Sequence, residues 1–438
     1  MRPMADDAGA AATARSRLEG VSRRLASQRH LLAVRDGVIG ALPLVLIGSV
    51  FLLLAQPPSA WLQDRLAPYV QTILVPYRML GGLVGLYVCF GAARSLARSH
   101  GLDELGAPLL AVASYLVAVG PAPLEGGGWG VSAEGLGAGG LFGALAIALG
   151  TVELQRIFAR RRWTIELPPS VPDAIGKSFA AIVPGFACVA ATWIVVHVLG
   201  VEVVGLLAHA ARPLIGATDS LPGALALVLV DSFMWLLGVH PLAVLAAVKP
   251  LWLSMLAENM AAAADGKALP HVATREFFNW FVWQGGSGGT LGAALLLLRA
   301  RSTALRTVGR LGIVPSLCNV NEPLLFGLPI VMNPRLALPF VLTPLATVTT
   351  TWIAMSTGLV ARPRLDVLWT LPSPLGAWLS TGGDAGAVAL QLFNLGLGLA
   401  IWWPFVRRLD RDLVTKEGAA PSEAAPSDDH GPAPALQP

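Results

Sequence analysis

Apolar residues fill most of this chain in runs that are long enough to cross a lipid bilayer. A hydrocarbon core of about 30 Å needs roughly 20 consecutive apolar residues in a helix. By that measure the sequence predicts ten spans, at 37–56, 77–97, 105–122, 137–155, 178–200, 222–240, 241–263, 277–298, 336–360 and 385–407. The pattern therefore predicts an all-α polytopic membrane protein with about ten transmembrane helices.

One apolar stretch does not fit that pattern. Residues 310–334 are interrupted by prolines, glycines and asparagines, so they do not favour an ordinary spanning helix. We expect this stretch to enter the membrane and return on the same side, as a re-entrant hairpin. Segment 241–263 begins at Pro241, and the sequence leaves open whether this segment spans the membrane or re-enters.

The positive charges between the spans predict the orientation of the chain. Cytoplasmic loops of membrane proteins are enriched in lysine and arginine. Six arginines lie within residues 1–30, five basic residues lie within 156–177, and none lies within 121–136. We therefore expect a multi-pass protein of the cell (inner) membrane with both termini cytoplasmic. Residues 1–30 would form a cytoplasmic segment, and 411–438 a disordered cytoplasmic tail.

The composition agrees with a membrane protein and argues against other classes. Of the 438 residues, 54% are hydrophobic and only 13% are charged, whereas soluble domains carry about 25% charged residues. No basic run is interleaved with aromatic residues, so nucleic acid is not an expected partner, whereas membrane lipid is. The three cysteines lack the spacing of metal ligands, and we expect neither a metal nor a cofactor.

The stretch "CNVNEPLLFGLPIVMNP" at 318–334 carries one carboxylate in apolar surroundings. Ionisable groups inside a membrane are costly, and they commonly mark functional sites. Asn319, Asn321 and Glu322 cluster where Pro323 breaks the helix, and transporters often bind their substrates at such breaks. Amide and carboxylate groups suit a polyhydroxylated solute such as a sugar. The alternative is that Glu322 pairs with a distant lysine or arginine and only holds helices together.

Two further stretches carry candidate residues. The stretch "DSFMWLLGVHP" places Asp231, Trp235 and His240 at the end of an apolar span, directly before a proline. Tryptophan and histidine rings suit stacking on the apolar face of a pyranose. His197 and His209, by contrast, are expected to be structural.

The second stretch is "LPHVATREFFNWFVWQGGSGGTLG" at 269–292, whose glycines allow close backbone approach. Helix packing explains these glycines as well as substrate contact does. His271, Asn279 and Trp283 are weaker candidates for the site.

Together, these residues resemble the membrane-embedded IIC permease of the sugar phosphotransferase system (PTS), in its lactose/cellobiose/diacetylchitobiose branch. The resemblance covers most of the chain. The stretches that carry it are "AVRDGVIGALPLVLIGSVFLLL" at 33–54, "PPSVPDAIGKSFAAIVPGF" at 168–186, "GVH" at 238–240, "QGGSGGTLG" at 284–292, "NVNEPLLFGLPIVMNP" at 319–334 and "WTLPSPLGAWLSTGGD" at 369–384.

The resemblance implies the PTS IIC fold, with two halves and re-entrant hairpins. Residues 31–200 would form the N-terminal transmembrane half and make the contact of a homodimer. Residues 201–410 would form the C-terminal half, which cradles the sugar. A separate IIB protein, charged by a IIA protein, would then phosphorylate the sugar. The chain would be the permease subunit of a protein-phosphohistidine–sugar phosphotransferase, and not a complete enzyme on its own.

The resemblance also implies roles for individual residues. Glu322 and His240 would grip the hydroxyls next to the phosphorylated position and act as the catalytic pair, with general-base work at the sugar hydroxyl. The candidate sugar-binding residues are Asn319, Asn321, Glu322, His240, Trp235, Asn279, Trp283, Gly286 and Ser287.

Three departures from the resemblance bear on the choice of sugar and on coupling to phosphorylation. Pro241 stands where a glycine is expected, Lys249 where a neutral residue is common, and Ala385 where a tryptophan is expected. The substrate is expected to be a β-linked disaccharide such as cellobiose or diacetylchitobiose. The alternatives are a sugar facilitator or proton-coupled carrier, and a sugar-sensing membrane protein, neither of which would couple to phosphorylation.

Overall fold

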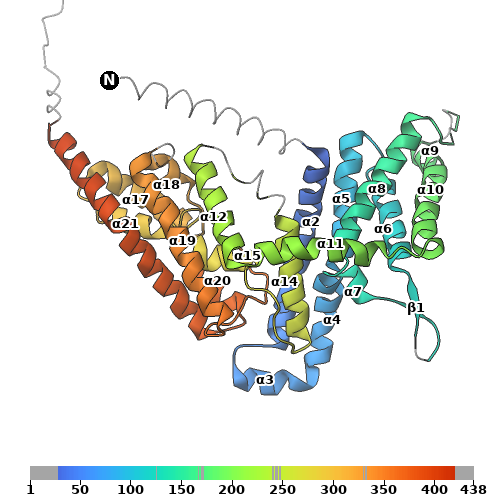
Figure 1. Ribbon diagram of the computed structural model, residues 1–438, viewed down its shortest axis with the longest axis horizontal. Helices are drawn as coiled ribbons and strands as arrows, with labels where there is room; N and C mark the ends of the chain where they lie inside the picture. Colours follow the sequence, from blue (N-terminus) through green and yellow to red (C-terminus); the bar gives the residue numbers. More distant parts are fainter. Residues whose placement is uncertain are drawn as a thin grey trace, which may run out of the picture.

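The computed structural model describes residues 28–419, except 125, 166, 169–171, 239–240, 242–244, 246–247, 329 and 331–332. Two bodies of helices lie side by side in Figure 1, the N-terminal one in blue and green and the C-terminal one in yellow to red. Helix α11 (Val203–Thr218) lies across the space between them. The mainly helical fold that the hydropathy pattern predicts is therefore confirmed.

The N-terminal body is a bundle of helices with one small β-hairpin. Strands β1 and β2 pair antiparallel between α6 and α7, a feature that the sequence did not predict. Its elements are α2 (Arg29–Ala55), α3 (Ala60–Leu66), α4 (Val70–Leu80), α5 (Val84–His100), α6 (Gly106–Val119), β1 (Pro121–Pro123), β2 (Trp129–Val131), α7 (Ala133–Leu136), α8 (Leu141–Arg160), α9 (Asp173–Ala180) and α10 (Ile182–Trp193), with short 3-10 turns at Ala67–Tyr69 and Gly81–Leu83 and a π-helical turn at Ile194–Val198.

Small residues let α2 and α5 pack closely in this body. A Cβ placed on Gly37 would lie 2.7 Å from the backbone nitrogen of Ala92, and one on Gly91 would lie 3.0 Å from the Cα of Gly37. Helices in membranes associate through such small residues, because lipid supplies no hydrophobic force between them. This close approach joins α2 to α5 in the N-terminal body.

The C-terminal body consists of shorter helices around two long ones. Its elements are α12 (Leu221–Leu236), α15 (Arg275–Phe277), the π-helical turn η4 (Phe278–Val282), α16 (Leu291–Leu297), α17 (Thr303–Leu317), α18 (Glu322–Gly327), α19 (Pro334–Ser356), α20 (Ser373–Ser380) and α21 (Ala385–Ala419). Helix α21 thus continues into the first residues of the predicted tail, while most of the segments at 1–30 and 411–438 lie outside the described residues.

Six helices in the described part of the chain are long and apolar enough to cross a membrane. They cover Arg29–Ala55, Trp61–His100, Leu141–Arg160, Ser178–Val198, Arg335–Ser356 and Ala385–Thr415. The pair α11 and α12 adds a seventh if it is one span, although it bends by 76°. Other predicted spans are shorter or broken, and α6, for example, has only 14 residues.

The predicted continuous span at 277–298 is wrong. Its first part ends as the π-helical turn η4, and α16 begins only at Leu291. Between them, Gly285, Gly286, Gly288 and Gly289 all have positive φ angles, a conformation that no ordinary helix contains. The chain therefore makes a loop within the body, where the hydropathy pattern predicts one helix.

The two bodies are joined by packing and by a few polar contacts. Helix α11 packs on α8, and α14 (Lys249–Ala264) packs on α2. The Gln56 side chain donates to the carbonyl of Ala263 at 2.5 Å and accepts from Arg364 at 3.0 Å. The backbone nitrogen of Asp366 donates to Ser49 Oγ on α2 at 3.0 Å. The segment around Arg364–Asp366 therefore holds the C-terminal body against α2.

A buried charge cluster lies beside this joint. The Arg275 guanidinium donates to Glu276 at 2.6 Å and also contacts Asp366. Both carboxylate side chains are fully buried, and the Trp280 indole donates to the second oxygen of Glu276. One cation thus compensates two buried acids at the start of the segment that leads into the glycine-rich stretch at 284–290.

Candidate functional site

The predicted break in the stretch 318–334 is present between α17 and α18. Helix α17 ends at Leu317, and α18 begins at Glu322. Asn319 lies between them with a φ angle of 59°, a left-handed conformation that asparagine tolerates better than most residues. The turn at Asn319 lets α18 fold back, and α18 packs on α17.

The side chain of Asn319 links this break to two distant segments. Its Oδ1 accepts from the backbone nitrogen of Gly285 at 3.1 Å and from Ser373 Oγ at 3.1 Å. Its Nδ2 donates to the carbonyl of Trp369 at 2.9 Å. The amide is therefore fully engaged in holding the break against the glycine loop and the segment at 369–373.

Asn321 fixes the glycine loop, which we define as residues 284–290. Its Nδ2 donates to the carbonyl of Ser287 at 2.7 Å and to Thr290 Oγ1 at 3.1 Å. A Cβ on Gly286, whose φ angle is 102°, would lie 2.5 Å from the Cγ of Asn321. Gly286 is thus required for the close approach of the loop to Asn321, in agreement with the packing interpretation of the glycines.

Glu322 lies at the edge of this assembly with its side chain exposed. It is the first residue of α18, whose Leu324 and Leu325 are fully buried and anchor the helix. Within the described part of the chain, Glu322 forms no ion pair or side-chain hydrogen bond. Nothing there supports the alternative that it pairs with a lysine or arginine, and its carboxylate is free to accept hydrogen bonds from a ligand.

The predicted aromatic residues lie in two places. Trp235 is buried on α12, one turn after Asp231. Trp283 is half-buried beside the glycine loop and packs on Phe278 and Trp252, at ring separations of 5.2 and 6.1 Å. Asn279 is half-buried in the π-helical turn before the loop. His240 lies outside the described residues.

The structure therefore brings three distant segments together. The break at 319–322, the glycine loop and α12 meet, because Ser287 Oγ donates to Asp231 Oδ1 at 3.2 Å. Among the described residues, no group of histidine, cysteine, aspartate or glutamate side chains is placed to hold a metal ion. What the assembly offers a ligand is a set of amide, hydroxyl and carboxylate groups.

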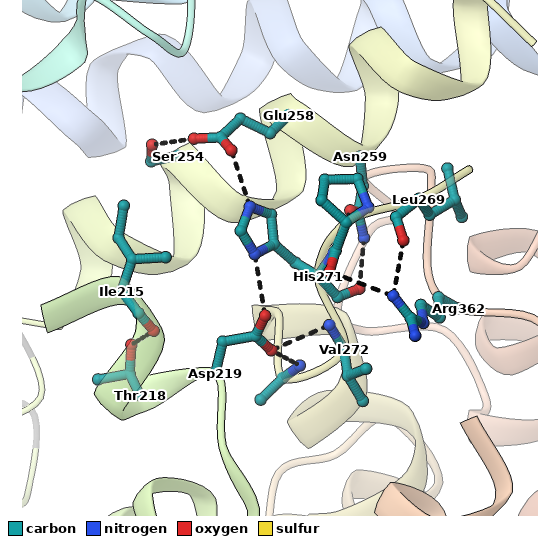
Figure 2. A network of polar contacts seen from close by, with 12 residues as sticks. Ile215, Thr218, Asp219, Ser254, Glu258, Asn259, Leu269, His271, Val272 and Arg362 are labelled. Carbon is teal, nitrogen blue, oxygen red and sulfur yellow. Dashed lines mark hydrogen bonds and ion pairs between the residues drawn. The ribbon is translucent and has the colours of Figure 1, made fainter. Parts of the chain in front are cut away.

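His271, a weaker candidate of the sequence, belongs to a different network (Figure 2). Its Nδ1 lies 2.9 Å from Asp219 Oδ2, and its Nε2 lies 2.8 Å from Glu258 Oε2. Asp219 stands at the bend between α11 and α12 and also accepts from the backbone nitrogens of Val272 and Ala273, at 2.9 and 2.7 Å. His271 thus links the bend to α14, and we call the contact of His271 with Asp219 and Glu258 the brace. The spacing of these residues in the sequence gives no signal of this contact.

The charge of this brace predicts a pH dependence of stability. The connection between α14 and α15 lies outside the long apolar helices. Burial lowers the pKa of His271, but hydrogen bonds and charges from Asp219 and Glu258 outweigh burial and raise the pKa from 6.5 to about 9. Because the pKa of His271 is raised in the folded state, protonation of His271 stabilises the fold, and this contribution is fully present below pH 6.5. The contribution, up to about 3 kcal/mol, is lost as the pH rises toward 9. We expect His271→Ala to flatten this part of the profile of thermal midpoint against pH in detergent.

The exposed His209 on α11 offers a matched control for that measurement. His209→Ala should keep the wild-type profile, because the described residues place no such pair of carboxylates against its imidazole. An unchanged profile in His271→Ala would contradict the charged brace.

The sequence profile of the family "Phosphotransferase system, EIIC" matches residues 35–344. The chain belongs to this EIIC family. The EIIC chain is 37% identical to the putative permease IIC component YwbA of Bacillus subtilis, over 92% of this chain and 96% of that protein. It is 35% identical to the cellobiose-specific EIIC component of Geobacillus stearothermophilus, over 93% and 95% of the two chains.

A solved structure shares the fold of this EIIC protein. The crystal structure of the transporter ChbC, the IIC component of an N,N'-diacetylchitobiose-specific phosphotransferase system, matches with a TM-score of 0.84 and 33% identity. The match covers 91% of this chain and 98% of that chain. The predicted family, its cellobiose/lactose/chitobiose group and the membrane-embedded IIC fold are therefore confirmed. EIIC components work with IIA and IIB partners and a sugar.

Proposed function

We propose that this EIIC component binds a β-linked disaccharide, such as cellobiose or diacetylchitobiose, and carries it across the membrane for phosphorylation by a IIB protein. The observation that carries the proposal is the meeting of the break at 319–322, the glycine loop and α12 beside an exposed Glu322, which has no ion-pair partner among the described residues. Relatives named for cellobiose and diacetylchitobiose support the class of sugar.

The chemistry of the site follows from its donors and acceptors. Glu322 accepts hydrogen bonds from two sugar hydroxyls, and as an acceptor next to the reacting hydroxyl it acts as the general base. Both amide atoms of Asn319 contact the protein, and Asn321 donates through its Nδ2 to the glycine loop. Both residues therefore position the loop and the break, and the side chains at the edge meet the ligand. His240, Trp235 and Trp283 remain proposed contacts of the sugar.

The assembly and orientation of the protein are also part of the proposal. Helix α2 begins and α21 ends toward the same edge of Figure 1, which fits two termini on one side of the membrane. Basic residues flank both of these ends, so we place both termini in the cytoplasm, where the IIB partner is found. The homodimer, with its contact in the N-terminal body, stays a prediction.

The test uses the full chain reconstituted in lipid vesicles with radiolabelled cellobiose. The complete series contains IIA and IIB proteins of a cellobiose-type system, the general phosphotransfer proteins and phosphoenolpyruvate. The second series contains all of these except IIB. We expect labelled sugar phosphate only in the complete series. Uptake of unmodified sugar at the same rate with and without IIB would contradict the proposal and favour a carrier.

A further inference from the structure

Asp231 is a buried acid that the proposed sugar site does not explain. Its side chain lies on the apolar helix α12, and the residue is 1% exposed. Oδ1 accepts from Ser287 Oγ at 3.2 Å, while the buried Oδ2 has no partner among the described residues. A carboxyl group at such a place in a membrane protein is costly, and an apolar side chain would fit α12 at a lower cost. A functional role would explain why an acid occupies this position.

No cation compensates Asp231 in the described part of the chain. It is the only titratable residue of α12, and the glycine loop contains none. On the neighbouring helix α19, the only charged residue is Arg335, which is exposed and pairs with Asp412. An ionised carboxylate with one hydrogen-bond donor and no counter-charge is strongly disfavoured in a buried site. Burial without a described counter-charge therefore favours the uncharged form of the Asp231 side chain.

The contact with Ser287 shows what an uncharged acid does here. Ser287 lies between two pairs of glycines that all have positive φ angles. Its side-chain hydroxyl is the only one within 285–289. Asn321 donates to the Ser287 carbonyl, and among the described residues only Asp231 contacts the Ser287 hydroxyl. Because the hydroxyl proton is directed at Asp231 Oδ1, the lone pairs of the Ser287 oxygen point elsewhere. They are left to accept a hydrogen bond from a ligand.

We propose that Asp231 is an uncharged positioning residue of the sugar site, which fixes the Ser287 hydroxyl so that it accepts a hydrogen bond from a hydroxyl group of the sugar. The proposal rests on the proposed function, since it takes Ser287 as a sugar contact. What Asp231 supplies is an acceptor oxygen at the right place, and its negative charge is not required.

The test is equilibrium binding of radiolabelled cellobiose to the full chain in detergent, with a thermal midpoint for each variant. Asp231→Leu and Ser287→Ala should each weaken binding roughly 3- to 10-fold, the usual effect of one hydrogen bond. The double variant should bind no more weakly than either single variant. Asp231→Asn, which keeps an acceptor oxygen, should bind like the wild type.

The thermal midpoints separate this role from a structural one. Asp231→Leu removes an unpaired buried acid from an apolar helix, so its midpoint should stay level or rise while its affinity falls. Losses that multiply in the double variant would overturn the proposal, because Asp231 would then not act through Ser287. Asp231→Asn as weak as Asp231→Leu would overturn the uncharged role. A wild type that binds no cellobiose, diacetylchitobiose or lactose would instead overturn the proposed function, and the inference with it.

Discussion

Replacing Glu322 by glutamine is expected to abolish most sugar binding and nearly all phosphoryl transfer. Glutamine keeps the size of the side chain but replaces one acceptor oxygen with a donor and removes the charge. A hydrogen bond to a charged group contributes about 1.5–3 kcal/mol, so the affinity should fall about 10- to 100-fold. Loss of a general base costs a further factor of about 10²–10⁴ in the chemical step. Equilibrium binding and the IIB-dependent phosphorylation rate measure the two effects separately.

The thermal midpoint and a substitution at a second exposed glutamate serve as controls for that test. Glu322 is exposed and has no ion pair in the described residues, so Glu322→Gln should keep the thermal midpoint of the wild type. Glu202 is also exposed and lies before α11, away from the break, and Glu202→Gln should leave binding unchanged. A fall in the midpoint of Glu322→Gln, with binding retained, would mean that Glu322 is a structural acid.

Replacing Arg275 by methionine is expected to have the largest effect on stability. The change leaves Glu276 and Asp366, both fully buried, without their cation. Removal of one partner from a buried ion pair costs about 3–5 kcal/mol, because the remaining charge is uncompensated. The thermal midpoint in detergent should fall by roughly 3–5 °C. Sugar binding should fall as well, since Arg275 precedes the π-helical turn that leads into the glycine loop.

A second substitution distinguishes lost compensation from lost packing. Arg275→Met combined with Asp366→Asn leaves one buried acid fewer, so it should recover part of the midpoint. The surface pair Arg335–Asp412 is the matched control, with 72% and 46% of the two side chains exposed. Arg335→Met should cost less than about 1 kcal/mol. Equal losses for Arg275→Met and Arg335→Met would contradict the role of the buried cluster.

The sequence predicts the break at 319–322 because its signals are local. Proline and asparagine punctuate an apolar run there, and the structure has a left-handed turn at Asn319. The same local reasoning failed for the segment before the break. Residues 310–317 belong to the regular helix α17, which contains Pro315 and Gly312 within Thr303–Leu317. A proline near the end of a helix costs little, and the pattern alone did not separate the helix from the turn after it.

The glycine loop is a feature that hydropathy alone does not predict. Residues 277–298 are apolar enough for one span, and the sum over the window hides the four glycines with positive φ angles. The glycines themselves indicated close packing, which the Gly286–Asn321 approach bears out. That the loop meets the break depends on the hydrogen bonds of Asn319 and Asn321, whose partners lie more than 30 residues away.

Long-range polar contacts are the part of the site that the sequence does not reveal. Asp231 and Ser287 are 56 residues apart, and His271 and Asp219 are 52 apart. No periodicity or motif connects such pairs, because they meet only when separate helices pack. For the same reason the sequence ranked His271 with the sugar candidates, whereas the structure places it in the brace between α11 and α14.

Equilibrium binding of a labelled sugar panel to the purified full chain measures directly which sugar, if any, the protein recognises. The panel comprises cellobiose, diacetylchitobiose, lactose, glucose and N-acetylglucosamine, each measured with the unlabelled sugar as competitor. We expect saturable binding of at least one β-linked disaccharide, tighter than that of either monosaccharide. Binding of a monosaccharide alone, or no saturable binding to any of the five, would contradict this expectation.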